Sequence, residues 1–319
     1  MNRKIVLSAD LGGTNLRVAA IDCAGEILFR TKIATPRTAD ARVILTLITD
    51  EAEKCRRAVE VQGSVVGIGT VVPGTVNVEK GIILQSPNVA ALNDFQIADE
   101  IKKRLAIPCF LENDANAAAV GENWCGASKG FLNSICVTLG TGVGGGIIID
   151  GKILRGIDGT AGEIGHICVE PFGAPCGCGS RGCVEQYSSA SAIKRLAYHL
   201  GERFPASDLL ESDDLTALEI YQAAKAGDEL ALEVFRQQGF YLGIALAGLI
   251  NVLNPEIIVI GGGAADGWDL FLPFMEAEIK SRSYREPAKR AQIVRAELGD
   301  DAGILGAARL ALKNISKVN

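Results

Sequence analysis

The sequence lacks a surplus of basic residues, and this absence limits the partners to be expected. Its 319 residues contain 32 lysines and arginines against 38 aspartates and glutamates, a formal net charge of -6. Proteins that bind nucleic acid neutralise its phosphates with an excess of positive side chains, and no such excess is present. We therefore expect no nucleic-acid partner.

The sequence also lacks a membrane-spanning run and an export signal. Its longest apolar stretch, FYLGIALAGLI at residues 240–250, is shorter than the roughly 20 residues that cross a bilayer. In the N-terminal sequence MNRKIVLSADLGGTN, only five residues separate Lys4 from Asp10, so the apolar run is too short for the core of a signal peptide. Nine cysteines, an odd number, do not fit a secreted disulfide framework. We therefore expect a cytoplasmic protein without a membrane partner.

Two similar stretches indicate a duplicated domain. IVLSADLGGTNLRVAAIDCAGEIL, from residue 5, and ICVTLGTGVGGGIIIDGKIL, from residue 135, each predict strand, glycine turn, strand, turn and strand. Because they lie too far apart for a solenoid repeat, we expect two like α/β domains across a cleft, unless the Gly-rich hairpins match by chance. Helices are expected near residues 40–60 and 95–105, from 115 onwards, within 205–250 and at 301–315.

Two glycine loops are candidate phosphate sites. GTGVGG at residues 140–145 fits the dinucleotide fingerprint, but a β-branched run follows it where that fingerprint needs a helix, so a simple hairpin is the alternative. DLGGTN at residues 10–15 adds a hydroxyl from Thr14 and a carboxylate from Asp10 that could hold Mg²⁺. A third cluster, at residues 261–263, strengthens the prediction of nucleotide binding.

A carboxylate in the stretch FLENDANAAAVGE, residues 110–122, has two interpretations. Asp114 is predicted at a junction between a strand and a helix of small residues, where aspartate commonly serves as a helix cap. Alternatively, Asp114 accepts the proton of an alcohol that attacks a phosphoryl group, and Asn113 orients that alcohol.

Residues 162–186, GEIGHICVEPFGAPCGCGSRGCVEQ, predict a metal centre. One imidazole and three thiols form a complete tetrahedral set for Zn²⁺, from His166, Cys176, Cys178 and Cys183. Four protein ligands would leave no open position for a catalytic water, so the zinc would be structural; unligated thiols are the alternative. Glu163 and Glu185 bracket the cluster, either as acceptors for sugar hydroxyls or as surface charge.

These motifs together resemble the ROK family (repressor, open reading frame, kinase), and among its members the bacterial glucokinases. The resemblance covers nearly the whole chain through DLGGTNLR, PNV, LENDANAAAVGE, LGTGVGGG, GEIGH, CGCGSRGCVEQ and NPEIIVIGGG. It implies the actin-like ATPase, ribonuclease-H-like fold with two similar α/β domains around a cleft. The domains would be residues 1–112, completed by the C-terminal helix 301–319, and residues 113–300 with the zinc loop.

The resemblance also implies roles for individual residues. Asp114 would be the general base, and the sugar would be bound by Asn113, Asp114, Glu163, His166 and Glu185, with Gly74 and Asn88 nearby. The nucleotide would be bound by Asp10, Gly12, Gly13, Thr14, Thr141, Gly142, Gly261 and Gly262. The zinc-bound histidine would face the sugar through its other ring nitrogen.

The activity to be expected is ATP-dependent phosphorylation of a hexose at its 6-hydroxyl, most simply of glucose, with Mg²⁺ bound to ATP, by a homodimer or homotetramer. Many such glucokinases carry a tryptophan after PN, whereas this chain reads PNVAALNDFQ, so mannose, fructose, N-acetylglucosamine or N-acetylmannosamine are alternatives. Members that act as repressors carry a helix-turn-helix domain that we do not expect here. A non-catalytic sugar-binding module and a dehydrogenase are further alternatives.

Overall fold

The computed structural model describes residues 3–86, 88–211 and 214–318, so that Pro87 of the PNV motif lies outside the described residues. The chain forms two compact units. Unit 1 consists of residues 1–132, 146–162 and 297–319, and unit 2 consists of residues 133–145 and 163–296.

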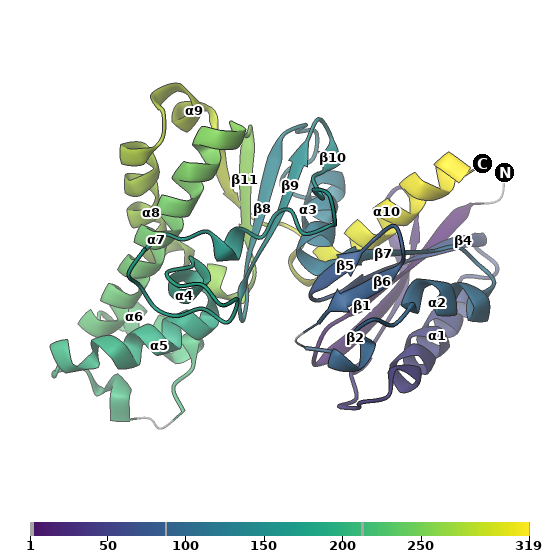
Figure 1. The fold of residues 1–319 in the computed structure, drawn as a ribbon, viewed down its shortest axis with the longest axis horizontal. Helices are drawn as coiled ribbons and strands as arrows, with labels where there is room; N and C mark the ends of the chain where they lie inside the picture. The colour runs from purple at the N-terminus through teal and green to yellow at the C-terminus, as the bar shows by residue number, and fades with distance from the viewer. Residues whose placement is uncertain (1–2, 87, 212–213, 319) are drawn as a thin grey trace. The chain divides into compact units, whose positions relative to one another are not determined.

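The first sheet has the strand order β3-β2-β1-β4-β7 (Figure 1). The first three strands are antiparallel, and β4 and β7 continue the sheet parallel to β1. The strands of this sheet are β1 (Lys4–Leu11), β2 (Asn15–Asp22), β3 (Ile27–Ala34), β4 (Ser64–Val72) and β7 (Cys109–Asn113). A separate hairpin pairs β5 (Thr75–Asn77) with β6 (Ile82–Gln85).

Helices cover both faces of this sheet because successive β1 side chains point to opposite sides. Ile5 and Leu7 enter the core under α1 (Ala41–Ala58) and α2 (Ile97–Leu105), whereas Val6 enters the core under α10 (Ala302–Val318). Figure 1 shows α10, in yellow, across the sheet from α1 and α2. The α1 sequence buries one helical face, and the Asp40 side chain caps its first turn by accepting from the Arg42 N–H.

Helix α3 (Asp114–Cys125) lies in unit 1 because its small residues pack directly against α10. A Cβ on Gly306 would lie 1.7 Å from the carbonyl oxygen of Ala117, and one on Gly121 would lie 2.1 Å from that of Ala302. The position of α3 in unit 1 differs from the predicted boundary, which assigned residues 113–300 to the other domain. Residues 146–162 also lie in unit 1 rather than with the rest of that predicted domain.

The second sheet repeats the topology of the first, with the order β10-β9-β8-β11-β12. Its β9 and β10 are antiparallel, and β8, β11 and β12 are parallel. The strands are β8 (Ser134–Leu139), β9 (Val143–Ile149), β10 (Lys152–Ile153), β11 (Ile257–Gly261) and β12 (Gln292–Arg295). The predicted internal repeat is therefore confirmed as a repeat of sheet order.

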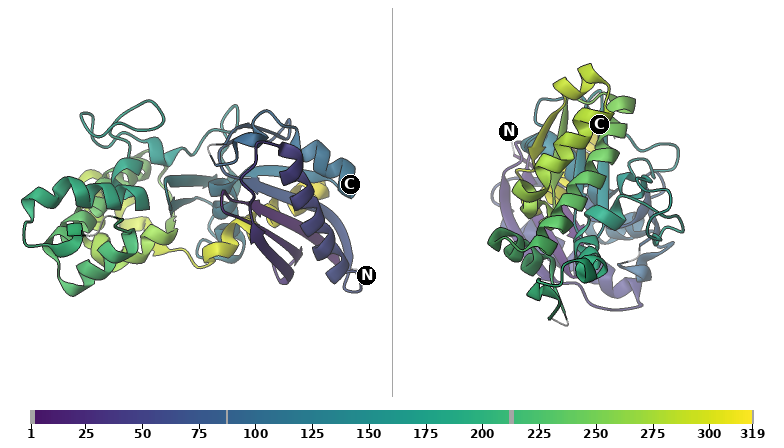
Figure 2. Two further views of the ribbon diagram at one scale, coloured as in Figure 1. Left: turned by 90° about the horizontal axis from the view of Figure 1, so that it is seen from below. Right: turned by 90° about the vertical axis from the view of Figure 1, so that its left-hand side faces the viewer.

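Unit 2 is mainly helical outside its strands. The apolar stretch at residues 240–250 lies in α7 (Glu229–Leu253) and is largely buried. Helix α8 (Trp268–Arg282) runs beside α7 (Figures 1 and 2), because Gly239 and Gly243 of α7 allow a close approach. The helices are α4 (Glu185–Ser188), α5 (Ala190–Leu200), α6 (Ala217–Ala226), α7 (Glu229–Leu253), α8 (Trp268–Arg282) and α9 (Arg285–Arg290). Among the described residues, no helix combines the length and the apolar composition that a bilayer crossing requires.

Candidate active site and candidate metal centre

The junction of β7 and α3 holds Asn113 and Asp114 side by side. Asn113 is the N-cap: its Oδ1 accepts from the backbone N–H groups of Ala115 at 2.9 Å and Asn116 at 3.1 Å. Its Nδ2 donates to Asp114 Oδ1 at 3.0 Å. The capping role that could have explained Asp114 is thus taken largely by its neighbour, and the Asp114 carboxylate remains exposed for other chemistry.

The Asp114 carboxyl has an unusual environment. One side of it is open to solvent, but the surrounding protein withdraws it from bulk water, and this desolvation raises its pKa from 3.8 to about 6. The Ala115 N–H, which donates to Oδ1 at 2.9 Å, opposes the shift, and the charge of Asp10 adds to it. A carboxylate with a pKa just below neutrality is suited to accept a proton.

Gly74 lies against the same junction. Its carbonyl oxygen accepts from Asn113 Nδ2 at 2.9 Å, which fixes the orientation of the amide. The residue has φ +111, and a Cβ there would lie 2.2 Å from the carbonyl oxygen of Gln85, so only glycine fits. Gly74, Asn113 and Asp114 are therefore brought together in unit 1.

Asp10 lies at the end of β1, next to the first glycine loop. Its carboxylate is 3.4 Å from Arg17 Nη1, yet burial outweighs this partner and raises the pKa of Asp10. The loop closes with the Gly12 N–H donating to the Asn15 carbonyl at 2.8 Å, and it joins β1 to β2. A half-buried carboxylate oxygen beside a loop of small residues fits the donor preference of Mg²⁺.

Asn88 approaches the same loop. A Cβ on Gly13 would lie 3.1 Å from Cβ of Asn88, and Gly13, Thr14 and Asn88 line one pocket of about 670 Å³. Its remaining lining comes from residues 35–39 and 89–91. The structure thus places one predicted sugar residue beside two predicted nucleotide residues.

The second glycine loop, in unit 2, joins β8 to β9. The dinucleotide fingerprint requires a helix after the glycines, and here a strand follows instead. Thr141 is exposed in this turn. Glu185, the first residue of α4, reaches the loop: its Oε2 accepts from the Val143 N–H at 3.1 Å, and a Cβ on Gly142 would lie 2.4 Å from that oxygen. Gly142 therefore provides the space that the Glu185 carboxylate occupies.

Gly261 is the last residue of β11 in unit 2, and Gly262 follows it directly. Gly262 has φ +88, and a Cβ there would lie 2.5 Å from the Leu139 carbonyl oxygen. A Cβ on Gly261 would lie 2.7 Å from that of Ala296. Both glycines permit the strand to end close to its neighbours, and of the two Gly262 is exposed whereas Gly261 is buried.

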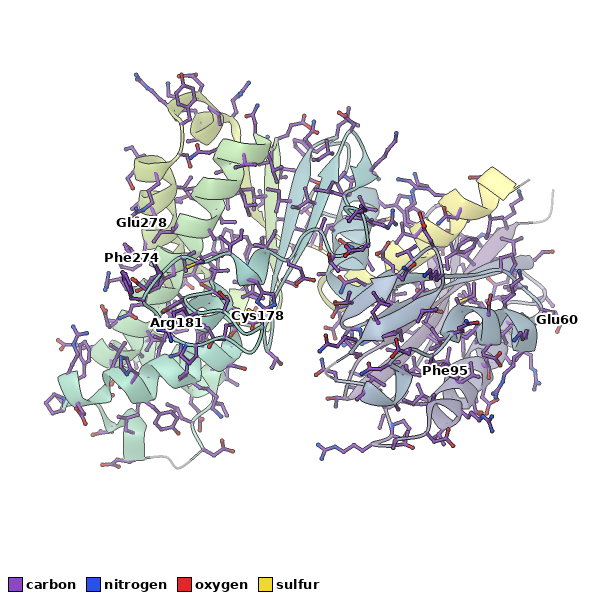
Figure 3. All side chains as sticks on the ribbon, in the orientation of Figure 1. Glu60, Phe95, Cys178, Arg181, Phe274 and Glu278 are labelled. Carbon is purple, nitrogen blue, oxygen red and sulfur yellow. The ribbon has the colours of Figure 1, made fainter. Side chains whose placement is uncertain are left out.

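Four side chains converge, one from the end of η2 (Ile164–His166) and three from the loop between η2 and α4. Their ligand atoms, from His166, Cys176, Cys178 and Cys183, lie within 4.8 Å of one another. The loop folds as an irregular hairpin, with backbone bridges from Cys168 to Cys183 and from Pro175 to Arg181, and Figure 3 labels Cys178 and Arg181 within it. Gly182, at φ +68, has the Glu170 carbonyl oxygen where a Cβ would be.

The spacing of these atoms fits Zn²⁺. With Zn–S bonds of about 2.3 Å, two thiolates of a tetrahedral site lie about 3.8 Å apart. The sulfurs of Cys178 and Cys183 are 3.7 Å apart, and His166 Nδ1 is 3.7 Å from the sulfur of Cys176. Three thiolates and one imidazole are also a donor set that zinc prefers.

The two ring nitrogens of His166 face different partners. Nδ1 points to the cysteine cluster, whereas Nε2 lies 3.9 Å from Glu163 Oε2. Glu163 is exposed, and Glu185 also borders the cluster, since its Oε1 lies 3.9 Å from the sulfur of Cys176. Both acids that bracket the motif in sequence are thus held next to it in space.

Sequence reasoning missed a buried ion pair behind Asn113. Glu112 is almost fully buried, and its Oε2 accepts from Nε and Nη2 of Arg155 at 3.0 and 2.5 Å. Its Oε1 accepts from the Asn113 N–H and from Nδ2 of Asn116, both at 3.2 Å. A glutamate inside an apolar strand was the available signal, but its partner is distant in sequence.

The candidate residues therefore form two groups, each within one unit. Unit 1 holds Asp10, Gly12, Gly13, Thr14, Gly74, Asn88, Asn113 and Asp114. Unit 2 holds Thr141, Gly142, Glu163, His166, Cys176, Cys178, Cys183, Glu185, Gly261 and Gly262.

Comparison with known proteins gives consistent results. Residues 6–314 match the ROK family. The chain is 39% identical over 312 residues to a glucokinase of Halalkalibacterium halodurans, covering 96% of this chain and 94% of that protein. It is 36% identical, with a TM-score of 0.80, to a ROK family glucokinase from Streptomyces griseus solved in complex with glucose and AMPPNP, covering 97% and 99% of the two chains.

A repressor is similar as well. The chain is 30% identical over 316 residues to a xylose repressor of Caldicellulosiruptor bescii, covering 97% of this chain and 78% of that protein. The structural similarity confirms the predicted actin-like ATPase fold with two α/β units. Because kinases and a repressor both match, the choice between them depends on the chemistry of the site.

Proposed function

Because the chain belongs to the ROK family, we propose that it is an ATP-dependent hexose kinase that converts glucose to glucose 6-phosphate. The similar glucokinases support this sugar. The observation that carries the proposal is Asp114: an exposed carboxylate, fixed at the start of α3, with its pKa raised to about 6. A protein that only binds sugar has no need of such a base.

In this proposal Asp114 accepts the proton of the 6-hydroxyl as that oxygen attacks the γ-phosphorus of ATP, and the bond from this phosphorus to the bridging oxygen breaks to release ADP. With a pKa of about 6, the carboxyl is mostly ionised at neutral pH and still basic enough to share the proton. Asn113 donates to Asp114 and to Gly74, so the carboxylate is held in one orientation for an in-line transfer.

The sugar hydroxyls would be recognised by acceptors and donors from both groups. Carboxylates accept hydrogen bonds from hydroxyls, which suits Glu163 and Glu185, and the outer nitrogen of His166 can add one more bond. Asn113 would contribute from unit 1, with Gly74 and Asn88 nearby. The nucleotide would be bound by the glycine loops, Gly12, Gly13, Thr14, Thr141, Gly142, Gly261 and Gly262.

Two metal ions belong to the proposal. Zn²⁺ would be held by His166, Cys176, Cys178 and Cys183, and with four protein ligands it would stabilise the loop rather than react. Mg²⁺ would accompany ATP, neutralise phosphate charge and be held in part by Asp10. The proposal also includes a cytoplasmic location and a homodimer or homotetramer.

A panel of hexoses tests the proposed function. ATP consumption would be measured with glucose, mannose, fructose, N-acetylglucosamine and N-acetylmannosamine, and we expect the highest kcat/KM with glucose. A higher value with another sugar would replace glucose as the substrate. Absence of ATP consumption with every sugar would reject the kinase and favour a sugar-responsive regulator.

A further inference from the structure

A second pocket in unit 1 lies apart from the candidate active-site residues. It has a volume of about 280 Å³ and is formed by α3, by residues 148–155 and by α10. Trp124 and Leu310 contribute apolar surface. All of its ionisable lining side chains are cationic: Lys152, Arg155, Arg309 and Lys313. Among the described residues that line it, none is a carboxylate.

The four cations are held in different ways. The guanidinium of Arg309 lies 5.1 Å from the ring centre of Trp124, which fixes its position. Nζ of Lys313 donates to the Gly151 carbonyl at 3.5 Å. Arg155 pairs with Glu112. Among the ion pairs of the described residues, none involves Lys152 or Arg309, so these two positive charges of the pocket are not neutralised by a carboxylate.

The chemistry and size of the pocket define its ligand. Arginine and lysine together bind phosphate, and both types line this pocket, one of each from residues 148–155 and one of each from α10. Ligand pockets usually measure about 300–1,000 Å³, so this one suits a small metabolite. A polyanion such as nucleic acid is disfavoured by the net charge of -6. We propose that this pocket binds the phosphate group of a small phosphate monoester.

Arg155 connects the pocket to the candidate active site. Its Nε and Nη2 hold Glu112, whose other oxygen accepts from the Asn113 N–H. A phosphate in the pocket competes with Glu112 for the Arg155 guanidinium and leaves a buried carboxylate less neutralised, close to Asp114. If the proposed kinase activity is correct, the bound phosphate monoester inhibits it without displacing glucose.

Calorimetric titration tests the binding, independently of turnover. Glucose 6-phosphate, glycerol 3-phosphate and inorganic phosphate would be titrated into the full-length protein saturated with glucose. We expect Lys152→Gln to weaken binding of the preferred probe about tenfold, Lys152→Gln/Arg309→Gln to weaken it further, and the exposed control Lys102→Gln to have no effect. Lys152 is exposed, so its replacement leaves folding intact, and the melting temperature verifies this.

The three probes distinguish the sources of the phosphate. Binding of both esters but not of inorganic phosphate supports a metabolite site, and binding of all three supports a general phosphate site. Either result supports phosphate binding in this pocket only if Lys152→Gln weakens the binding of the probe. Equal binding by wild type and the double variant, or no binding by wild type at millimolar concentrations, overturns the proposal.

Inhibition kinetics test the connection to the active site. We expect glucose 6-phosphate to lower kcat at saturating glucose in the wild type, and Lys152→Gln to lose this inhibition while its basal kcat stays unchanged. Inhibition that is purely competitive with glucose and unaffected by Lys152→Gln would reject the connection. The calorimetric result would remain valid even if no hexose were phosphorylated.

Discussion

Asp114 and Asn113 divide two tasks that a single residue often combines. Asn113 satisfies the free N–H groups at the start of α3, and Asp114 therefore keeps an oxygen that no helix contact requires. The cost is a charged group withdrawn from water, which is expressed in its raised pKa. Such local destabilisation is common where a side chain must react.

Replacing Asp114 tests its role directly. We expect Asp114→Asn to lower kcat by about 10²–10⁴-fold, because a general base contributes this much, and to leave the dissociation constant of glucose within about threefold. A coupled assay measures the first and calorimetry the second. Turnover close to that of the wild type would contradict the assignment of the base.

The pH dependence provides a second test at this residue. Since Asp114 must be ionised to act, kcat/KM should rise with pH through an apparent pKa of about 6. Because the pKa of Asp114 is higher in the folded protein than in the unfolded chain, ionisation of this carboxyl destabilises the fold. The stability is therefore fully present below about pH 3.8 and is lost as pH rises through about 6. Asp114→Asn should therefore melt about 2 °C higher than wild type at pH 8, with the difference disappearing near pH 4.

Gly142 tests whether the second glycine loop affects the sugar as well as the nucleotide. A Cβ at this position meets the Glu185 carboxylate, the movable end of a side chain, so Gly142→Ala should fold and displace Glu185. We expect the KM for glucose to rise about tenfold and the KM for ATP to change less. Gly140→Ala is the matched control, because a Cβ there has only one neighbour, at 4.0 Å. Equal effects of the two substitutions would argue against this role of Glu185.

At the level of the element, the loop from residue 167 to 184 has little regular structure, so we expect its shape to depend on the proposed zinc. Cys178→Ser, or chelation, should remove about one zinc per chain and raise the KM for glucose about 10–100-fold, because Glu163, His166 and Glu185 lose their support. Cys168→Ser is the control, since this exposed thiol lies in the same loop outside the cluster. Metal analysis and kinetics measure the outcome, and unchanged sugar affinity after metal loss would contradict it.

The contact of α3 with α10 depends on the absence of side chains. Gly306→Val would drive atoms into the Ala117 carbonyl and should lower the free energy of unfolding by about 3 kcal/mol or more. Gly248→Ala, on the exposed side of α7, should be neutral or slightly stabilising, because no described residue outside the helix's own backbone lies within 4 Å of the new Cβ. Chemical denaturation measures both, and similar values for the two would show that the helices can move apart.

For the whole molecule, the sequence predicted what is encoded locally. The strands around DLGGTN and the helix after Asn113 follow from turn residues and hydrophobic periodicity, and the convergence of one histidine and three cysteines follows from their spacing in the sequence. The extent of unit 1 could not be predicted, because residues 146–162 join it through contacts distant in sequence. The pair of Glu112 and Arg155 was missed for the same reason.

The position of α10 has a consequence for how the protein is made. The ribosome completes every strand of the first sheet and the whole of α3 long before it reaches residues 302–318, yet those residues cover one face of that sheet and support α3. During synthesis, this apolar face therefore waits without its natural cover while unit 2 emerges. Until the last helix is made, we expect the nascent chain to be most prone to aggregation, and α3, which begins at Asp114, acquires its packing partner only at the end.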